Sequence, residues 1–176
     1  MSILFAIAFA NNLWLSGYDV HGAFCKPSLP EDKDIYVRVP KTVLGGEEKF
    51  WKLKKTLYGL RESSKAFYDH VSTLLISKGY CRTMNDPCMF FKRVGEDYIL
   101  MVIHVDDFAC ATNNVDMMNQ LETDLETEYV IEKTKSLENY LGIHIRYNDD
   151  GTTTLCQPKA LNTLFTNFNF KFIKLL

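Results

Sequence analysis

Three aspartates next to short apolar stretches could act together in catalysis. Asp106 and Asp107 are adjacent in the apolar stretch "YILMVIHVDDFACAT", and Asp19 stands at the end of a short apolar strand in "GYDVHGAF". Adjacent carboxylates near an apolar surface raise at least one pKa unless a cation neutralises the pair. Three carboxylates could hold two hard cations, which prefer oxygen ligands and stabilise both the attacking and the leaving oxygen of phosphoryl transfer. The three aspartates therefore indicate nucleotidyl transfer.

An ordinary turn is the alternative for the adjacent pair. Asp107 would then make an Asx-type turn and Asp106 would cap it in solvent, as turn aspartates commonly do. A two-residue turn between strands favours Asn-Gly or Asp-Gly, however, because positive φ at both positions is costly for residues with a Cβ atom. Asp106-Asp107 is therefore unfavourable as a turn. The local pattern leaves both interpretations open, and the third acid, Asp19, favours the metal site.

Hydrophobic periodicity predicts the elements that must position these acids. We expect helices over residues 2–16, 61–79, 114–128 and 158–168. We expect strands over residues 18–20, 35–39, 49–60, 88–94, 98–105 and 108–112, and a hairpin over residues 139–157. Asn114 is the expected N-cap of the third helix, and Pro158 begins the fourth. This pattern predicts an α+β fold, an antiparallel sheet covered by helices on one face.

Length and charge narrow the class of protein. The chain has 176 residues, of which 47% are hydrophobic, and this suits one domain with one core. The net charge of −2 does not suit a generally basic nucleic-acid coat. Residues 49–65 nevertheless hold six basic residues and one acidic residue, whereas residues 116–138 hold seven acidic and two basic residues. Each run is either a binding surface or simply a solvated face.

Cysteine spacing and hydropathy indicate the compartment. The five cysteines form no C-x-x-C pair, which argues against a disulfide framework and against a structural zinc site. We therefore expect an intracellular protein of the cytoplasm or nucleus. The N-terminal stretch "ILFAIAFA" is similar to a signal peptide but lacks a basic region before it. No run reaches the roughly 20 apolar residues of a membrane-spanning helix, so no membrane contact is expected.

Seven stretches resemble, in order and spacing, the reverse transcriptase of copia-type retrotransposons. They are "YDVHGAF", "DIYVRVP", "WKLKKTLYGLRESSKAFYDH", "GYCRTMNDPCMFFKR", "ILMVIHVDDFACAT", "NYLGIHI" and "TLCQPKALNTLFTNF". The resemblance implies the palm of a polymerase right hand. It further implies one partial domain over residues 1–176, with the palm core in 1–130 and the palm end and start of the following hairpin and helix in 131–176. The family's fingers lie mostly upstream of the first helix, so we expect them to be largely missing.

The resemblance also implies roles for individual residues. Asp19 and Asp106 would ligate two Mg²⁺ ions, which Mn²⁺ could replace, with Asp107 and the carbonyl of Val20 completing the site. Phe24 would exclude a 2′-hydroxyl from the nucleotide sugar, although ordinary core packing is its alternative. Further nucleotide contacts would come from Tyr58, Gly59 and Arg61, and nucleic-acid phosphates would be bound by Lys52, Lys54, Lys55 and Lys65. Tyr140 and Leu141 would support the primer end. His104 departs from the family, which usually has tyrosine before "VDD".

The function implied by the resemblance is RNA-directed DNA polymerisation. The chain would be a nucleotidyltransferase from the polyprotein of a transposable element, and its partners would be an RNA template, a DNA primer, deoxynucleoside triphosphates and the rest of that polyprotein. Whether this chain is itself an active enzyme stays open, because fingers close on the incoming nucleotide. The alternatives are an inactive relic or a domesticated fragment that binds nucleic acid through residues 49–65. An unrelated metal-dependent nuclease is disfavoured, because only His104 is expected near the acids.

Overall fold

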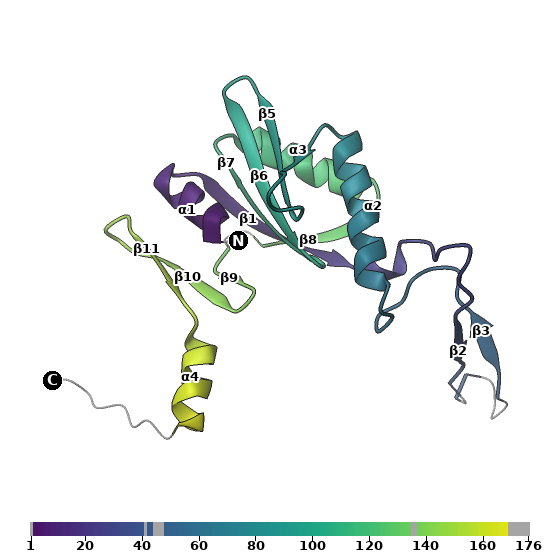
Figure 1. Cartoon of the computed structure of the whole chain (residues 1–176). Helices are drawn as coiled ribbons and strands as arrows, with labels where there is room; N and C mark the ends of the chain where they lie inside the picture. Colours follow the sequence, from purple (N-terminus) through teal and green to yellow (C-terminus); the bar gives the residue numbers. More distant parts are fainter. Residues whose placement is uncertain (1, 41, 44–47, 135–136, 169–176) are drawn as a thin grey trace.

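A six-stranded antiparallel sheet forms the centre of the molecule (Figure 1). The computed structural model describes residues 2–40, 42–43, 48–134 and 137–168. The strands follow the order β4-β5-β6-β7-β1-β8 across the sheet. Their bounds are Trp14–His21 for β1, Cys81–Arg82 for β4, Met89–Val94 for β5, Asp97–His104 for β6, Asp107–Thr112 for β7 and Val130–Thr134 for β8. The expected α+β class and antiparallel sheet are confirmed.

Both faces of the sheet carry an apolar core. Helices α2 (Ser63–Ser77) and α3 (Val115–Glu126) cover the face to which Phe108 and Cys110 of β7 point. On the opposite face Ala109 and Ala111 pack with helix α1 (Ser2–Ala10). The second core is completed by Tyr140 and Ile145 of a three-stranded sheet, formed by β9 (Asn139–Tyr140), β10 (Ile143–Tyr147) and β11 (Thr153–Cys156).

We expected helices on only one face of the sheet, but α1 and the three-stranded sheet cover the other face as well. Successive side chains of a strand point to opposite faces of the sheet. In β6, Ile99 and Met101 belong to the first core, whereas Leu100 and Val102 belong to or pack against the second. Because the middle strands are apolar on both faces, both faces must be covered.

The first helix ends earlier than predicted. We expected a helix over residues 2–16, but α1 ends at Ala10 and β1 begins at Trp14. Asn12 lies between them with φ 50, a left-handed conformation that asparagine tolerates better than most residues. The prediction of a helix end near Gly17 is wrong, because Gly17 lies inside β1 and pairs with Ala109.

Strand β8 was absent from the prediction. Four of its five residues are exposed, so its sequence lacks the apolar alternation of a half-buried strand. It lies at an edge of the sheet and pairs with β1 from Gly17 to His21. Pairing with β1, rather than local sequence preference, therefore defines this strand.

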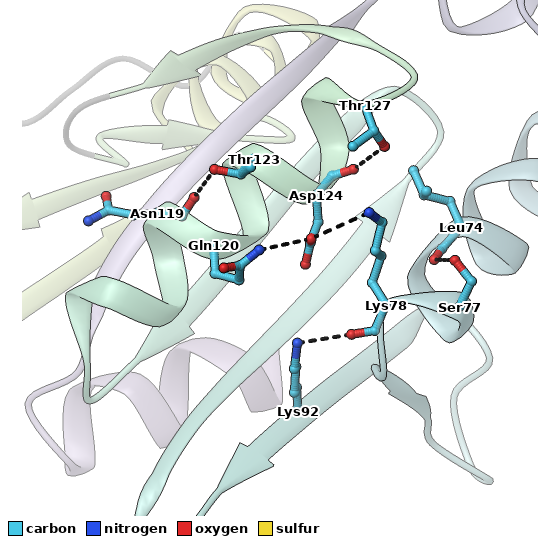
Figure 2. A network of polar contacts seen from close by, with 9 residues as sticks. All are labelled: Leu74, Ser77, Lys78, Lys92, Asn119, Gln120, Thr123, Asp124 and Thr127. Carbon is cyan, nitrogen blue, oxygen red and sulfur yellow. Dashed lines mark hydrogen bonds and ion pairs between the residues drawn. The ribbon is translucent and has the colours of Figure 1, made fainter.

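The expected second and third helices are confirmed, and a polar network joins them. The Asn114 side chain caps α3 by accepting a hydrogen bond from the backbone N–H of Asp116 at 2.8 Å. Figure 2 shows Asp124 of α3, a buried residue that accepts a hydrogen bond from Gln120 at 3.0 Å and lies 3.8 Å from the ammonium of Lys78. This ion pair ties the end of α2 to α3.

The remaining elements lie outside the main sheet. Strands β2 (Tyr36–Arg38) and β3 (Phe50–Lys52) pair in a ribbon that extends away from it (Figure 1). The strand expected over residues 49–60 is therefore much shorter than predicted. The 3₁₀ turn η1 (Ala23–Cys25) follows β1, and α4 (Pro158–Asn167) begins at its proline as expected. Within the described residues, every helix is too short or too polar to cross a membrane.

Candidate functional site

Pairing of β1 with β7 brings together three aspartates that are far apart in the sequence. Asp19 of β1 is the register partner of Asp107 at the start of β7. The backbone carbonyl of Asp106 accepts a hydrogen bond from the N–H of Val20 at 3.0 Å. All three acids therefore lie where the β6–β7 turn meets the end of β1.

The turn beside these acids differs from the expected one. His104 pairs with Asp107, so the two turn residues are Val105 and Asp106 rather than Asp106 and Asp107. Val105 has φ 56, which is rare for a β-branched residue. This left-handed conformation costs roughly 1–2 kcal/mol. The turn next to the acids is therefore strained, and the strain lies in a valine rather than in an aspartate.

The surroundings of Asp107 disfavour its charged form. Burial raises the pKa of Asp107 above its ordinary value, and the neighbouring Asp106 and Asp19 raise it further, while His104 opposes them. Burial also raises the pKa of Tyr58, and the negative charge of Asp106 raises it further. The Tyr58 hydroxyl is therefore within electrostatic reach of the acids. A bound cation would relieve the repulsion at Asp107.

The donor atoms suit a hard divalent cation, because the carboxylates and the nearby Val20 carbonyl offer only oxygen. The side chains are not gathered into a finished metal cluster, however. Within the described part of the chain, no three histidine, cysteine, aspartate or glutamate side chains converge closely enough to hold an ion. Binding of a metal would therefore require the carboxylate side chains to turn towards one another.

Two further polar residues lie beside Asp19 that the sequence analysis did not identify. Glu132 of β8 is the register partner of Asp19 on its other side. The His21 Nε2 atom lies 3.3 Å from Glu132 Oε2 and 4.0 Å from Asp19 Oδ2. Residues two apart on a strand share a face, so the spacing of Asp19 and His21 could have indicated this neighbour. Glu132 gave no such signal, because β8 itself was not predicted.

Phe24 and Tyr58 contact each other close to the acids. Phe24 lies in η1, and its ring centroid is 4.6 Å from that of Tyr58 in an edge-to-face arrangement. The same ring lies 6.3 Å from Phe67 in the first core, so Phe24 also takes part in core packing. Tyr58 is 51% exposed. Gly59 follows with φ 91, and Arg61 is exposed just before α2.

The four lysines expected to bind phosphates lie on three segments rather than in one stripe. Lys52 belongs to the β2–β3 ribbon and is 2.5 Å from Asp34. Lys54 and Lys55 are exposed on the segment that follows the ribbon. Lys65 lies on α2 and is 2.5 Å from Asp69.

Tyr140 links the three-stranded sheet to the acids. Its hydroxyl donates a hydrogen bond to the backbone carbonyl of Asp107 at 3.3 Å. Leu141 follows with φ 49, at the turn between β9 and β10. The second sheet therefore supports the strand that carries Asp107.

Comparison with known proteins identifies related sequences. A family model described as reverse transcriptase (RNA-dependent DNA polymerase) matches residues 1–173. The chain is 28% identical over 172 residues to the retrovirus-related Pol polyprotein from transposon TNT 1-94 of Nicotiana tabacum, covering 96% of this chain and 13% of that protein. It is 25% identical over 130 residues to the Pol polyprotein from transposon RE1 of Arabidopsis thaliana, covering 73% of this chain and 9% of that protein.

A solved structure also aligns with much of the chain. The apo telomerase of Candida tropicalis, truncated from its C-terminal domain, is 14% identical, with a TM-score of 0.45. The alignment covers 88% of this chain and 40% of that chain.

Proposed function

The chain belongs to the reverse transcriptase (RNA-dependent DNA polymerase) family, and we propose that it forms the palm of an RNA-directed DNA polymerase within a retrotransposon polyprotein. The observation that best supports this proposal is the β1–β7 pairing, in which Asp19 lies opposite Asp107 beside the turn that holds Asp106. The chain spans only 13% and 9% of the two relatives described above. The activity, substrates and partners of the whole protein are therefore part of the proposal.

In this proposal Asp19 and Asp106 hold two Mg²⁺ ions, with Asp107 and the Val20 carbonyl as additional ligands. When bound, these ions lower the pKa of a primer 3′-hydroxyl and neutralise charge on the triphosphate. Mn²⁺ could take their place, because it accepts the same oxygen ligands. The pKa of Asp107, raised first by burial and then by Asp106 and Asp19, supports this assignment, since a cation between the carboxylates would offset the contribution of the two neighbouring acids.

The nucleotide and the template–primer would be bound by residues around the acids. Phe24 would lie beneath the sugar and exclude a 2′-hydroxyl, a role supported by its contact with Tyr58 beside the acids. Tyr58, Gly59 and Arg61 would line the nucleotide site. Phosphates of template and primer would be contacted by Lys52, Lys54, Lys55 and Lys65. Residues 1–130 would form the palm core, and residues 131–176 would form the palm end and the start of the following hairpin and helix.

Primer extension tests this function. The chain is incubated with an RNA template, a DNA primer, deoxynucleoside triphosphates and Mg²⁺, beside the variants Asp19→Asn and Asp106→Asn. Extension should fall by about 100-fold or more in each variant, because each removes a charged metal ligand. Asp149→Asn is the matched control, since Asp149 lies in an exposed turn of the β10–β11 hairpin. Extension that survives in both aspartate variants rejects the assignment.

A non-catalytic nucleic-acid-binding fragment is the second candidate. It is favoured by the observation that the described acids do not converge into a finished metal cluster. Template binding that is unchanged by Asp106→Asn and by a chelator, without any extension by the wild-type chain, would support this candidate.

A further inference from the structure

The β2–β3 ribbon carries aromatic and basic side chains in alternation on one face. Tyr36 is the register partner of Lys52, and Arg38 is the register partner of Phe50. Because alternate residues of a strand share a face, these four side chains lie on the same side of the ribbon. Aromatic and basic residues thus alternate both along each strand and across the pair. The opposite face carries the partners Val37 and Trp51.

The two rings on this face are open to solvent. Tyr36 and Phe50 are each 56% exposed. The Arg38 guanidinium lies 5.9 Å from the centroid of the Phe50 ring, so the cation and the ring form one continuous surface. A two-stranded ribbon is at best marginally stable alone, and exposed aromatic patches often mark binding surfaces. The composition of this patch determines which ligand it fits.

We propose that this face binds an unpaired nucleic-acid strand, whose bases stack on Tyr36 and Phe50 and whose phosphates contact Arg38 and Lys52. Aromatic rings offer stacking platforms to any unpaired base, and interleaved cations follow the phosphate backbone. A protein partner without phosphates would match the rings but not the alternating positive charges. Charge complementarity therefore favours a polyanion with flat rings, which is a single nucleic-acid strand.

The existing ion pairs on the ribbon do not prevent this binding. Arg38 lies 3.3 Å from Glu48, and Lys52 lies 2.5 Å from Asp34. All four side chains are more than half exposed, and exposed ion pairs of this kind contribute little, so a phosphate can replace the carboxylate. Lys54 and Lys55 add further exposed positive charge directly after the ribbon.

The ribbon also lies within reach of the acids. Tyr58 lies six positions after Lys52 in the sequence, and an extended chain of this length spans at most about 20 Å. Tyr58 is within electrostatic reach of Asp106 and Asp19. A strand bound on the ribbon could therefore continue to the acid site. That this strand is the template ahead of the primer rests on the proposed function, whereas the binding itself does not.

Fluorescence anisotropy with a fluorescein-labelled oligouridine tests the proposal, and a fully paired duplex of the same length serves as the second probe. Tyr36→Leu and Phe50→Leu should each weaken oligouridine binding by about 5- to 100-fold, since each removes one stacking platform. Their effect on duplex binding should be much smaller, because paired bases do not expose their faces. Tyr36→Phe should bind as the wild type does, because it keeps the ring.

Trp51→Leu is the matched control, since Trp51 is 53% exposed but lies on the opposite face of the same strand. It should leave oligouridine affinity unchanged. Arg38→Gln and Lys52→Gln should each reduce the salt dependence of binding, by about one phosphate contact. Asp34→Asn should tighten binding, because it frees Lys52 to contact a phosphate. Circular dichroism of each variant confirms that the fold is retained.

Several results would overturn the proposal. One is an equal loss of affinity in Trp51→Leu and Phe50→Leu. Another is unchanged oligouridine binding in both Tyr36→Leu and Phe50→Leu. A third is a wild-type dimer in sedimentation analysis that Phe50→Leu dissociates without any change in oligouridine affinity, which would assign the face to a second copy of the chain.

Different results decide the proposed polymerase function and the proposed ribbon surface. Extension that survives in both Asp19→Asn and Asp106→Asn, together with oligouridine binding through Tyr36 and Phe50, would reject the assigned polymerase site and retain the ribbon surface. Conversely, extension that requires Asp106, together with oligouridine binding that is unchanged in Tyr36→Leu and Phe50→Leu, would retain the polymerase function and reject the ribbon surface.

Discussion

The charged form of Asp107 destabilises the folded chain, whereas metal binding requires that charge. Its pKa is raised above the ordinary 3.8 by burial and by Asp106 and Asp19. Between pH 3.8 and the raised pKa, the folded state therefore binds more protons than the unfolded state. Stability from this residue therefore falls as pH rises from about 3.8 through the raised pKa, and it stays lower above it. The neutral variant Asp107→Asn should consequently have a higher Tm than the wild type at pH 7. Thermal unfolding followed by circular dichroism measures the difference.

The pH dependence and Mg²⁺ provide the controls for this prediction. The stabilisation by Asp107→Asn should disappear below pH 3.8, where the wild-type carboxyl is protonated in both states. Added Mg²⁺ should raise the Tm of the wild type more than that of the variant, since a ligand stabilises only the state that binds it. Asp149→Asn, in an exposed turn, should change neither result. A lower Tm for Asp107→Asn at pH 7 contradicts the prediction.

Val105 is the second residue whose conformation can be tested alone. Replacement by glycine relieves the roughly 1–2 kcal/mol of left-handed strain, while the flexibility of glycine in the unfolded chain costs about 0.5–1 kcal/mol. Val105→Gly should therefore leave the free energy of unfolding unchanged or raise it by up to about 1.5 kcal/mol. Urea denaturation gives this value.

Val130→Gly is the matched control for Val105. Val130 is also exposed, at 66%, but it lies in β8 and has no positive φ. Its replacement should therefore destabilise the chain by about 0.5–1 kcal/mol. Equal destabilisation by the two substitutions would show that the Val105 backbone carries no strain.

At the scale of elements, an ion pair between a buried carboxylate and a partly exposed lysine joins the end of α2 to α3, beside the apolar contacts of the two helices. Asp124 is 5% exposed and lies 3.8 Å from Lys78 (Figure 2). Lys78→Met should destabilise the chain by about 1–3 kcal/mol, because it leaves a buried carboxylate without its cation. The double variant Lys78→Met/Asp124→Leu should be more stable than Lys78→Met, since it removes the charge as well. Chemical denaturation of the three chains measures both effects.

An exposed pair on the same helix supplies the comparison. Lys65 and Asp69 are 2.5 Å apart on α2, and the Lys65 side chain is 81% exposed. Lys65→Met should leave stability nearly unchanged, because exposed ion pairs contribute little. If both lysine variants behave alike, the burial of Asp124 is not the cause of the effect.

At the scale of the whole molecule, Gly17 and Leu137 join the main sheet to the chain that follows β8. A Cβ atom on Gly17 would lie 2.5 Å from Leu137 Cδ1, and Leu137 is buried at 2% exposure. Leu137 belongs to the second core together with Phe5 and Tyr140. Gly17→Ala should therefore force the buried Leu137 side chain to shift within the second core and cost about 1–3 kcal/mol.

A double variant separates overpacking from loss of glycine itself. Leu137→Ala alone should cost about 2–5 kcal/mol through the cavity it leaves. Gly17→Ala/Leu137→Ala should be more stable than the sum of the two single effects indicates, because the new methyl group fills part of that cavity. Strictly additive free energies of unfolding would argue against the contact.

The sequence by itself determined the α+β class, helices α2, α3 and α4, the Asn114 cap and the three acids, because each depends on neighbouring residues or on a regular spacing along one segment. Only the tertiary structure decided that α1 ends at Ala10 and that β8 exists, because both depend on pairing with β1. Likewise, the position of Glu132 beside Asp19 and the alternating face of the β2–β3 ribbon follow from strand register. Register depends on contacts between distant segments, and no local pattern in this chain specifies them.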